Sequence, residues 1–249
     1  MTAKDQIPLE LGFAPTHNHD DFFVTDCNRA AFRAITDWTD WPDGRLALTG
    51  PAGSGKTHLT AIWAAKTCGV TLPAIDLTEK ALQSLLLERA VAIEDVDCLA
   101  GLPTSARRQC ETLLFHLFNF AGAEGMSLLL TGRLGPAHWL IQTPDLASRC
   151  AAMAHIAILP PDDEVLASVL IKQFSDRRLD VPAEVIQYLL VRMERSFDAA
   201  ERIVEDLDRL ALARRRRITR QLAGEVFDAY AEGSDQAPAH GDMVERQGD

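Results

Sequence analysis

The chain has 249 residues, 47% hydrophobic and 24% charged, a composition that excludes a disordered or collagen-like protein. It carries 25 Lys and Arg against 36 Asp and Glu, and the resulting net charge of −11 argues against a protein that coats nucleic acid or an anionic membrane unaided. The five scattered cysteines favour buried, reduced thiols over a disulfide framework or a zinc site. With neither an apolar signal core nor a membrane-spanning run in the sequence, we expect a soluble, cytoplasmic protein.

Short apolar runs alternate with helical patterns over the first two thirds of the chain. Residues 1–18 lack periodicity and predict an extended tail, and a helix is expected from about residue 28 to Pro42. Further helices are expected at 56–68, and at 104–121 with Thr104 as its N-cap. The strand-like runs are 46–48, 73–77, 91–93, 127–131 and 155–158. This alternation predicts an α/β fold, a mainly parallel sheet covered by helices on both faces.

The pattern changes after Pro160 and Pro161, where helices follow one another without strands. They are expected at about 164–177, 182–194, 197–215 and 219–231. The expected organisation is therefore an extended tail, an α/β domain, a small all-helical domain and a disordered polar tail. The corresponding ranges are 1–18, 19–160, 161–232 and 233–249.

The strongest motif is a complete P-loop, G-x-x-x-x-G-K-[ST]. It consists of Gly50, Pro51, Ala52, Gly53, Ser54, Gly55, Lys56 and Thr57. Its glycines let backbone N–H groups face phosphates, and the start of the following helix favours an anion. Lys56 would place its ammonium on the β- and γ-phosphates, and the Thr57 hydroxyl would bind Mg²⁺. The neighbouring His58 is included in the expected nucleotide site.

Apolar residues 91–93 lead into a second group of candidates, the acids Glu94, Asp95 and Asp97. One carboxylate, for which Glu94 is the candidate, would hold Mg²⁺ directly or through water, and Asp95 would polarise an attacking water. The strand-end residue is usually Asp, so the extra methylene of Glu94 changes the metal geometry. The alternative interpretation is a turn of solvated acids.

At this point the sequence resembles the AAA+ ATPases of the DnaA branch, and within them the Hda proteins that regulate the replication initiator. The resemblance covers residues 6–231. It rests on the segment 21–31 upstream of the P-loop, the acidic strand end 93–97, a sensor-1 strand at 128–133, and the sequence Asp-Leu-Ala-Ser-Arg at 145–149.

The resemblance implies an AAA+ P-loop core followed by a helical lid, with ADP or ATP and Mg²⁺ as ligands. It implies that Phe23 and Val24 lie along the adenine and that Thr131 is the sensor-1 polar group. Arg149 would be an arginine finger that reaches the γ-phosphate of a neighbouring subunit, where its permanent charge stabilises the transition state. The alternative for Arg149 is an ion pair with local acids such as Asp145.

The lid departs from the family at one functional position. The sensor-2 arginine of the family is replaced by Asp198, which cannot contact phosphate in the same way, and nearby Arg195 and Arg202 are more simply solvated helix charges. Together with Glu94, this replacement predicts weak hydrolysis of the chain's own nucleotide, with phosphate binding retained.

The N-terminal segment 6–13 resembles the short motif by which bacterial proteins dock on the replicative sliding clamp, the β subunit of DNA polymerase III. Gln6 would donate and accept hydrogen bonds, while Leu9, Leu11 and Phe13 would be apolar anchors of an extended peptide. The alternative is a tail that packs on its own domain.

As the resemblance implies, the chain would be a negative regulator of replication initiation. Held on the DNA-loaded clamp and binding ADP, it would use Arg149 in trans to stimulate hydrolysis of ATP bound to DnaA. The chain ends about eighteen residues after its last expected helix, too few for a DNA-binding domain, so DNA would be reached mainly through the clamp. The basic run Arg214–Arg217 is most simply explained by a helix C-terminus, and the alternative is direct contact with DNA.

Two other functions stay open at this stage, as does self-association. One is a self-sufficient ATPase of the helicase-loader type that acts on single-stranded DNA. The other is a non-catalytic adaptor that uses nucleotide only to order its fold and recruits a partner to the clamp.

Overall fold

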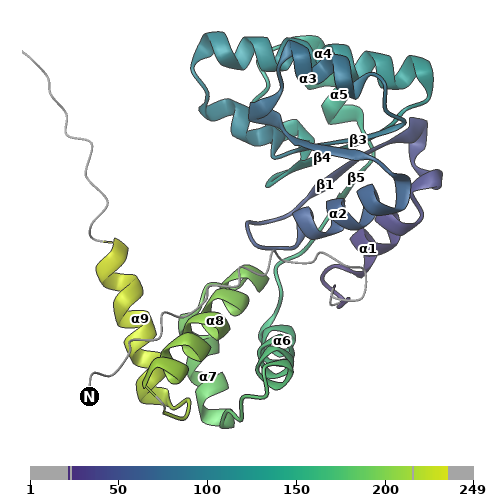
Figure 1. The fold of residues 1–249 in the computed structure, drawn as a ribbon. Helices are drawn as coiled ribbons and strands as arrows, with labels where there is room; N and C mark the ends of the chain where they lie inside the picture. Colours follow the sequence, from purple (N-terminus) through teal and green to yellow (C-terminus); the bar gives the residue numbers. More distant parts are fainter. Residues whose placement is uncertain (1–21, 23, 215, 235–249) are drawn as a thin grey trace, which may run out of the picture. The chain divides into compact units, whose positions relative to one another are not determined.

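The computed structural model describes residues 22, 24–214 and 216–234, and the described chain divides into two compact units between Pro160 and Pro161 (Figure 1). The predicted clamp-binding residues Gln6, Leu9, Leu11 and Phe13 lie outside the described residues, as does Phe23. The two units are considered separately.

The first unit is built on a five-stranded sheet in the order β2-β3-β4-β1-β5, in which every neighbouring pair is parallel. The strands are β1 Arg45–Thr49, β2 Val70–Pro73, β3 Ala90–Glu94, β4 Ser127–Gly132 and β5 His155–Ala157. The three central strands are almost wholly buried and apolar, as a parallel sheet covered on both faces requires. The predicted parallel α/β sheet is confirmed.

Helices cover both faces of this sheet (Figure 1). They are α1 Arg29–Thr36, α2 Lys56–Thr67, α3 Glu79–Leu85, α4 Thr104–Glu124 and α5 Pro144–Ala152, with 3-10 turns at Trp38–Asp40, Pro42–Gly44, Ala74–Asp76, Val96–Gly101 and Pro136–His138. Strand residues alternate between two cores: Leu128 and Leu130 belong to the core that includes α4, and Leu129 to the core that includes α2. This alternation follows from the period of two along a strand.

Two local predictions in this unit are wrong. The edge strand is Val70–Pro73, whereas Ala74–Asp76 forms a 3-10 turn, because the mostly exposed β2 lacks the apolar run that the sequence analysis relied on. Thr104 is the first residue of α4 and does not cap it, since Pro103 with φ −54° supplies the extended residue that enters the helix. The helix continues to Glu124 and ends at Gly125, whose φ is +69°.

The cysteines are all free, and only part of the expectation of buried thiols holds. Cys110 and Cys150 are buried, Cys27 is half-buried, and Cys68 and Cys98 are exposed. Burial raises the pKa of the Cys150 thiol to about 12, so this group stays protonated in the folded protein.

The second unit is helical throughout its described residues and has its own core. Its helices are α6 Asp163–Asp176, α7 Ala183–Arg192, α8 Phe197–Arg214 and α9 Arg220–Ser234. Asp162 caps α6 by accepting a hydrogen bond from the N–H of Val165 at 2.8 Å. Helix α9 runs two residues past the expected boundary at 232. None of the helices in the described parts of the chain is long and apolar enough to cross a membrane.

Candidate functional site

The P-loop connects β1 to α2 at the carboxyl edge of the sheet. The N–H of Gly50 donates to the carbonyl of Gly132 at 3.2 Å, which ties the loop to the end of β4. A side chain at Gly50 would not fit, because an added Cβ would lie 2.7 Å from Ser54 Oγ and 3.0 Å from the carbonyl oxygen of Ile158. Gly55, with φ +92°, occupies a left-handed conformation at the N-cap of α2.

The interior of this loop is polar. Lys56 is only 8% exposed, and its Nζ donates to the carbonyls of Gly50 at 2.9 Å and Pro51 at 3.0 Å. Ser54 Oγ is buried without a hydrogen-bond partner among the described residues. A buried cation and an unsatisfied hydroxyl at a helix start are groups that suit an anion. The loop therefore fits the phosphates of a nucleotide.

Two hydrogen bonds join the acidic turn after β3 to the end of β4. The N–H of Asp95 donates to Oγ1 of the buried Thr131 at 3.0 Å, and the N–H of Arg133 donates to Oδ2 of Asp97 at 3.1 Å. Asp95 itself has φ +54°, which is unusual for a residue other than glycine and is held here by its neighbours. Thr131 and Asp95, predicted separately, thus lie together.

The charges of this edge are close enough to influence one another. Although Cys98 is exposed as a residue, partial desolvation of its thiol raises the pKa above its usual value, and the carboxylates of Asp97 and Asp95 add to the effect, while Arg133 and Lys56 oppose it. The hydrogen bonds of Gly50 to Gly132 and of Asp95 to Thr131 bring the P-loop and the acidic turn to the same end of β4.

The residue types at this site fit a Mg²⁺ ion that arrives with a nucleotide. Among the described residues, no three His, Cys, Asp or Glu side chains form a group that could hold a metal. Magnesium is commonly bound by one or two carboxylates together with phosphate oxygens and waters, so a full protein cage is not needed. Thr57 is exposed and Glu94 is half-buried.

The sequence analysis missed Phe22. Its ring stacks on Phe32 at 5.7 Å with an interplanar angle of 10°, and meets the ring of His58 edge-on at 5.1 Å. An added Cβ at Gly55 would lie 3.2 Å from Phe22, so this ring lies against the start of α2. Val24 is exposed. The available signal was the position of Phe22 within the segment 21–31 that resembles the family.

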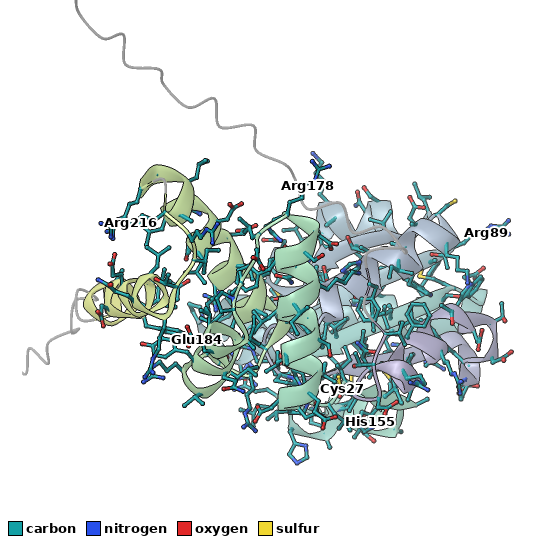
Figure 2. The ribbon with its side chains drawn as sticks, turned by 90° about the horizontal axis from the view of Figure 1, so that it is seen from below. Cys27, Arg89, His155, Arg178, Glu184 and Arg216 are labelled. Carbon is teal, nitrogen blue, oxygen red and sulfur yellow. The ribbon has the colours of Figure 1, made fainter. Side chains whose placement is uncertain are left out.

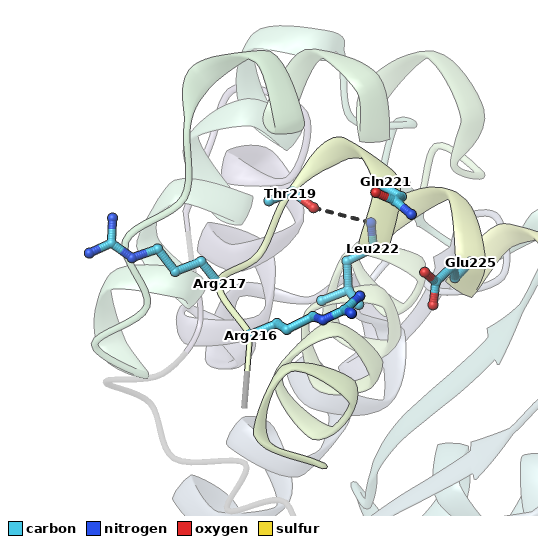
Figure 3. Close-up of a pocket in the computed structure, with 6 residues that line it drawn as sticks. All are labelled: Arg216, Arg217, Thr219, Gln221, Leu222 and Glu225. Atoms are coloured by element: carbon cyan, nitrogen blue, oxygen red, sulfur yellow. Dashed lines mark hydrogen bonds between the residues drawn. The ribbon is translucent and has the colours of Figure 1, made fainter. Parts of the chain in front are cut away.

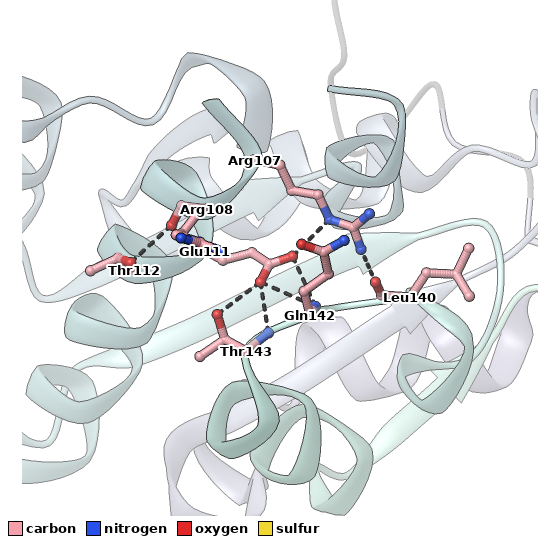
Figure 4. Close-up of polar contacts among 7 residues, drawn as sticks. All are labelled: Arg107, Arg108, Glu111, Thr112, Leu140, Gln142 and Thr143. Atoms are coloured by element: carbon pink, nitrogen blue, oxygen red, sulfur yellow. Dashed lines mark hydrogen bonds and ion pairs between the residues drawn. The ribbon is translucent and has the colours of Figure 1, made fainter. Parts of the chain in front are cut away.

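Arg149 lies exposed on α5, with its guanidinium over the ring of Phe115 of α4 at 5.5 Å. Within the described chain, no ion pair joins Arg149 to Asp145, so the alternative of a local pair is not observed. The segment that leads into α5 is held by the buried carboxylate of Glu111 on α4 (Figure 4). Sequence reasoning did not identify Glu111.

The lid arginines lie in exposed ion pairs. Arg195 contacts Asp163 at 3.1 Å and Arg202 contacts Glu194 at 3.9 Å, which agrees with their interpretation as ordinary surface charges. Asp198 lies in the first turn of α8.

Of the basic run, Arg214 pairs with Glu225, while Arg216 and Arg217 are exposed between α8 and α9 (Figure 2). Both also line a small hollow at the start of α9 (Figure 3). The other residues of the hollow are Thr219, Gln221, Leu222 and Glu225. The acid in this set balances part of the basic charge.

Comparison with known proteins agrees with this architecture. A family model described as the Hda lid domain matches residues 162–226, so the resemblance to Hda proteins is shown for this part of the chain. Domain III of DnaA from Thermotoga maritima superposes with a TM-score of 0.70 at 19% identity, covering 87% of this chain and 98% of that one.

Two longer DnaA structures are also similar. AMPPCP-bound DnaA from Aquifex aeolicus gives a TM-score of 0.68 at 16% identity, covering 88% of this chain and 71% of that one. A replication initiator DnaA bound to AMPPCP and single-stranded DNA gives 0.68 at 18% identity, covering 78% of this chain. The matched part spans 65% of the length of that initiator. The chain therefore has a DnaA-like fold, and its residues 162–226 match the Hda lid domain.

Proposed function

We propose that this chain is a nucleotide-binding regulator of replication initiation that acts on DnaA. The observation that carries the proposal is that an Hda-type lid domain follows, along the chain, a DnaA-like core with a complete P-loop. Solved DnaA structures of the same fold contain a nucleotide analogue, which supports an adenine nucleotide, ADP or ATP, as the ligand of the P-loop.

In this proposal each polar group of the site has a task. Lys56 neutralises phosphate charge, and Thr57 with Glu94 orients Mg²⁺, which supplies further charge compensation when bound. Thr131 fixes the backbone of Asp95, whose carboxylate would orient a water. Because Glu94 and Asp198 replace the usual residues, we expect the chain's own hydrolysis to be slow and the nucleotide to act mainly as a ligand that orders the core.

The proposed action on DnaA depends on Arg149. Its guanidinium is exposed and always charged, so it is available to a phosphate that a second protein presents. An arginine supplied in trans accelerates phosphoryl transfer by on the order of 10³–10⁵. Hydrolysis of DnaA-bound ATP would leave the initiator in its ADP form. Residues 6–13 would hold the chain on the sliding clamp, and DNA would be reached through the clamp.

The test is a reconstitution of this chain with DnaA, DNA-loaded clamp and labelled ATP. Arg149→Ala is expected to abolish the stimulation of DnaA-ATP turnover, and Gln6→Ala to reduce it. The matched control is Arg89→Ala, an exposed arginine just before β3, which should stimulate like the unmodified chain (Figure 2).

Two outcomes would reject the proposal. Normal stimulation by Arg149→Ala would favour a non-catalytic adaptor on the clamp. Hydrolysis by the isolated chain that single-stranded DNA accelerates, and that Lys56→Ala removes, would favour a self-sufficient ATPase of the helicase-loader type.

A further inference from the structure

Helix α4 contains a buried carboxylate, that of Glu111, whose side chain is 1% exposed (Figure 4). Its Oε1 accepts hydrogen bonds from Arg107 Nε at 2.9 Å and from the N–H of Gln142 at 3.0 Å. Its Oε2 accepts from the N–H and the hydroxyl of Thr143, each at 2.8 Å. Four donors, three of them from another segment, thus saturate one carboxylate.

Those three donors belong to the segment that starts the helix of Arg149. Thr143 is the N-cap of α5, and Arg149 follows six residues later on the same helix. Arg107, oriented by Glu111, also donates to the carbonyl of Leu140 just upstream. Leu140 has φ +54° and its side chain is exposed, so the kink before α5 is held by these backbone contacts and not by burial of its side chain.

Helix α4 contacts α5 again one turn further along. Phe115 stands four residues after Glu111, which places both side chains on the same face of α4. Its ring lies under the Arg149 guanidinium at 5.5 Å. The inner face of α5 is fixed by Leu146 and Cys150, both fully buried. One helix therefore sets the start of α5 and the resting position of its arginine.

Stability alone does not explain a charge at this place. Burying a carboxylate is unfavourable, and replacing a buried ion pair by apolar side chains of similar volume is often neutral or stabilising. A saturated carboxylate, however, fixes the direction of every donor around it, which an apolar contact does not. The hydrogen bonds of Glu111 therefore fix the direction in which α5 begins relative to α4.

We infer that Glu111 is a positioning residue for Arg149: through Gln142 and Thr143 it sets the start of α5 so that the arginine is aligned to reach a phosphate bound by another protein. The inference rests on the proposed function. A displacement of about 1 Å at a reacting centre lowers a rate by on the order of 100-fold, so a shift of the α5 start is measurable as rate.

Two substitutions test this without emptying the core. Glu111→Gln keeps the volume but turns one acceptor into an NH₂ group that faces donors, and Thr143→Val removes a single hydroxyl donor. Glu124→Gln is the matched control, an exposed glutamate at the far end of the same helix. Each variant is assayed in the DnaA reconstitution for the maximal stimulated rate, the half-saturating concentration, and ADP binding to its own P-loop.

Glu111→Gln is expected to lower the maximal stimulated rate by about 10- to 100-fold and Thr143→Val by several-fold, with the half-saturating concentration and ADP affinity unchanged. Glu124→Gln should match the unmodified chain. A merely structural role would not produce this pattern.

The inference is overturned if folded Glu111→Gln stimulates normally, or if it lowers ADP affinity as much as the rate. Should Glu111→Gln fail to fold, Thr143→Val decides by the same criteria. Normal stimulation by Arg149→Ala would reject the proposed function and the inference together. Loss with Arg149→Ala but not with either α4–α5 variant would reject the inference alone.

Discussion

Removal of the Glu111 carboxylate by Glu111→Ala should lower the stability of the first unit far more than the loss of a surface ion pair. The substitution leaves Arg107, whose side chain is 11% exposed, without its carboxylate, and removes the acceptor of two backbone N–H groups and a hydroxyl. Removing one partner of a buried ion pair costs about 3–5 kcal/mol. We expect a loss of that size in the free energy of unfolding.

The comparison variant is Asp26→Ala, which breaks the pair of Asp26 with Arg29. The two groups are 2.7 Å apart, but their side chains are 93% and 53% exposed. Solvent screening limits such a pair to less than about 1 kcal/mol. Both variants remove one carboxylate from one arginine, but only Glu111→Ala also leaves three further donors without their acceptor, so the difference between the two losses measures the contribution of the whole buried cluster.

Urea unfolding followed by tryptophan fluorescence isolates the relevant unit. The four tryptophans, at 38, 41, 63 and 139, all lie before Pro160, whereas both tyrosines, Tyr188 and Tyr230, lie in the helical unit. Tryptophan emission therefore follows the unfolding of the first unit, and unfolding of the helical unit does not contribute to the measured transition. A loss for Glu111→Ala no larger than that for Asp26→Ala would refute the reasoning.

Three further predictions concern single groups. Burial of Glu111 opposes its ionisation, but its hydrogen bonds outweigh this and hold its pKa below the usual 4.5, so the stabilisation by the carboxylate is complete above that pH. The difference in the free energy of unfolding between the unmodified chain and Glu111→Gln should therefore become smaller as the pH falls below 4.5, and a difference that grows would contradict this. Nucleotide should slow thiol-reagent modification of Cys98, whose N–H donates to the carbonyl of Asp95 in the acidic turn, but not of Cys68 at the far end of α2, although both cysteines are exposed; equal protection of both would count against the site. Gly132→Ala should lower the free energy of unfolding by about 1–3 kcal/mol in the same urea assay, because its Cβ would lie 2.5 Å from the indole of the buried Trp139. An unchanged urea midpoint would show that the indole can move away without cost.

Local patterns predicted most of the fold and the phosphate-binding loop. Both signals are local: each of β1, β3 and β4 is a short apolar run, and the P-loop glycines stand within one eight-residue motif. A few neighbouring positions of sequence are therefore enough to identify them. The edge strand β2 was misplaced because an exposed strand carries no apolar run. Strands are predicted from a single sequence by the apolar residues that they bury, and β2 buries few of its residues.

The parts of the site that were missed depend on contacts distant in sequence. Glu111 and its partners at 142–143 are 31 and 32 residues apart, and nothing in the surrounding letters distinguishes this glutamate from a surface one. Asp97 and Arg133 were read only as members of separate motifs, yet their hydrogen bond joins the two.

The stacking of Arg149 on Phe115 lowers the conformational entropy that the arginine must lose when it binds a phosphate. A free arginine side chain carries about 2 kcal/mol of rotamer entropy, part of which must be lost when it binds a phosphate. On the ring, many of those rotamers are already excluded before any partner arrives. The cation–π contact itself contributes only about 0.5–1 kcal/mol at an exposed site, so a phosphate can displace the ring easily. The arginine is thereby ordered in the resting protein without being locked there.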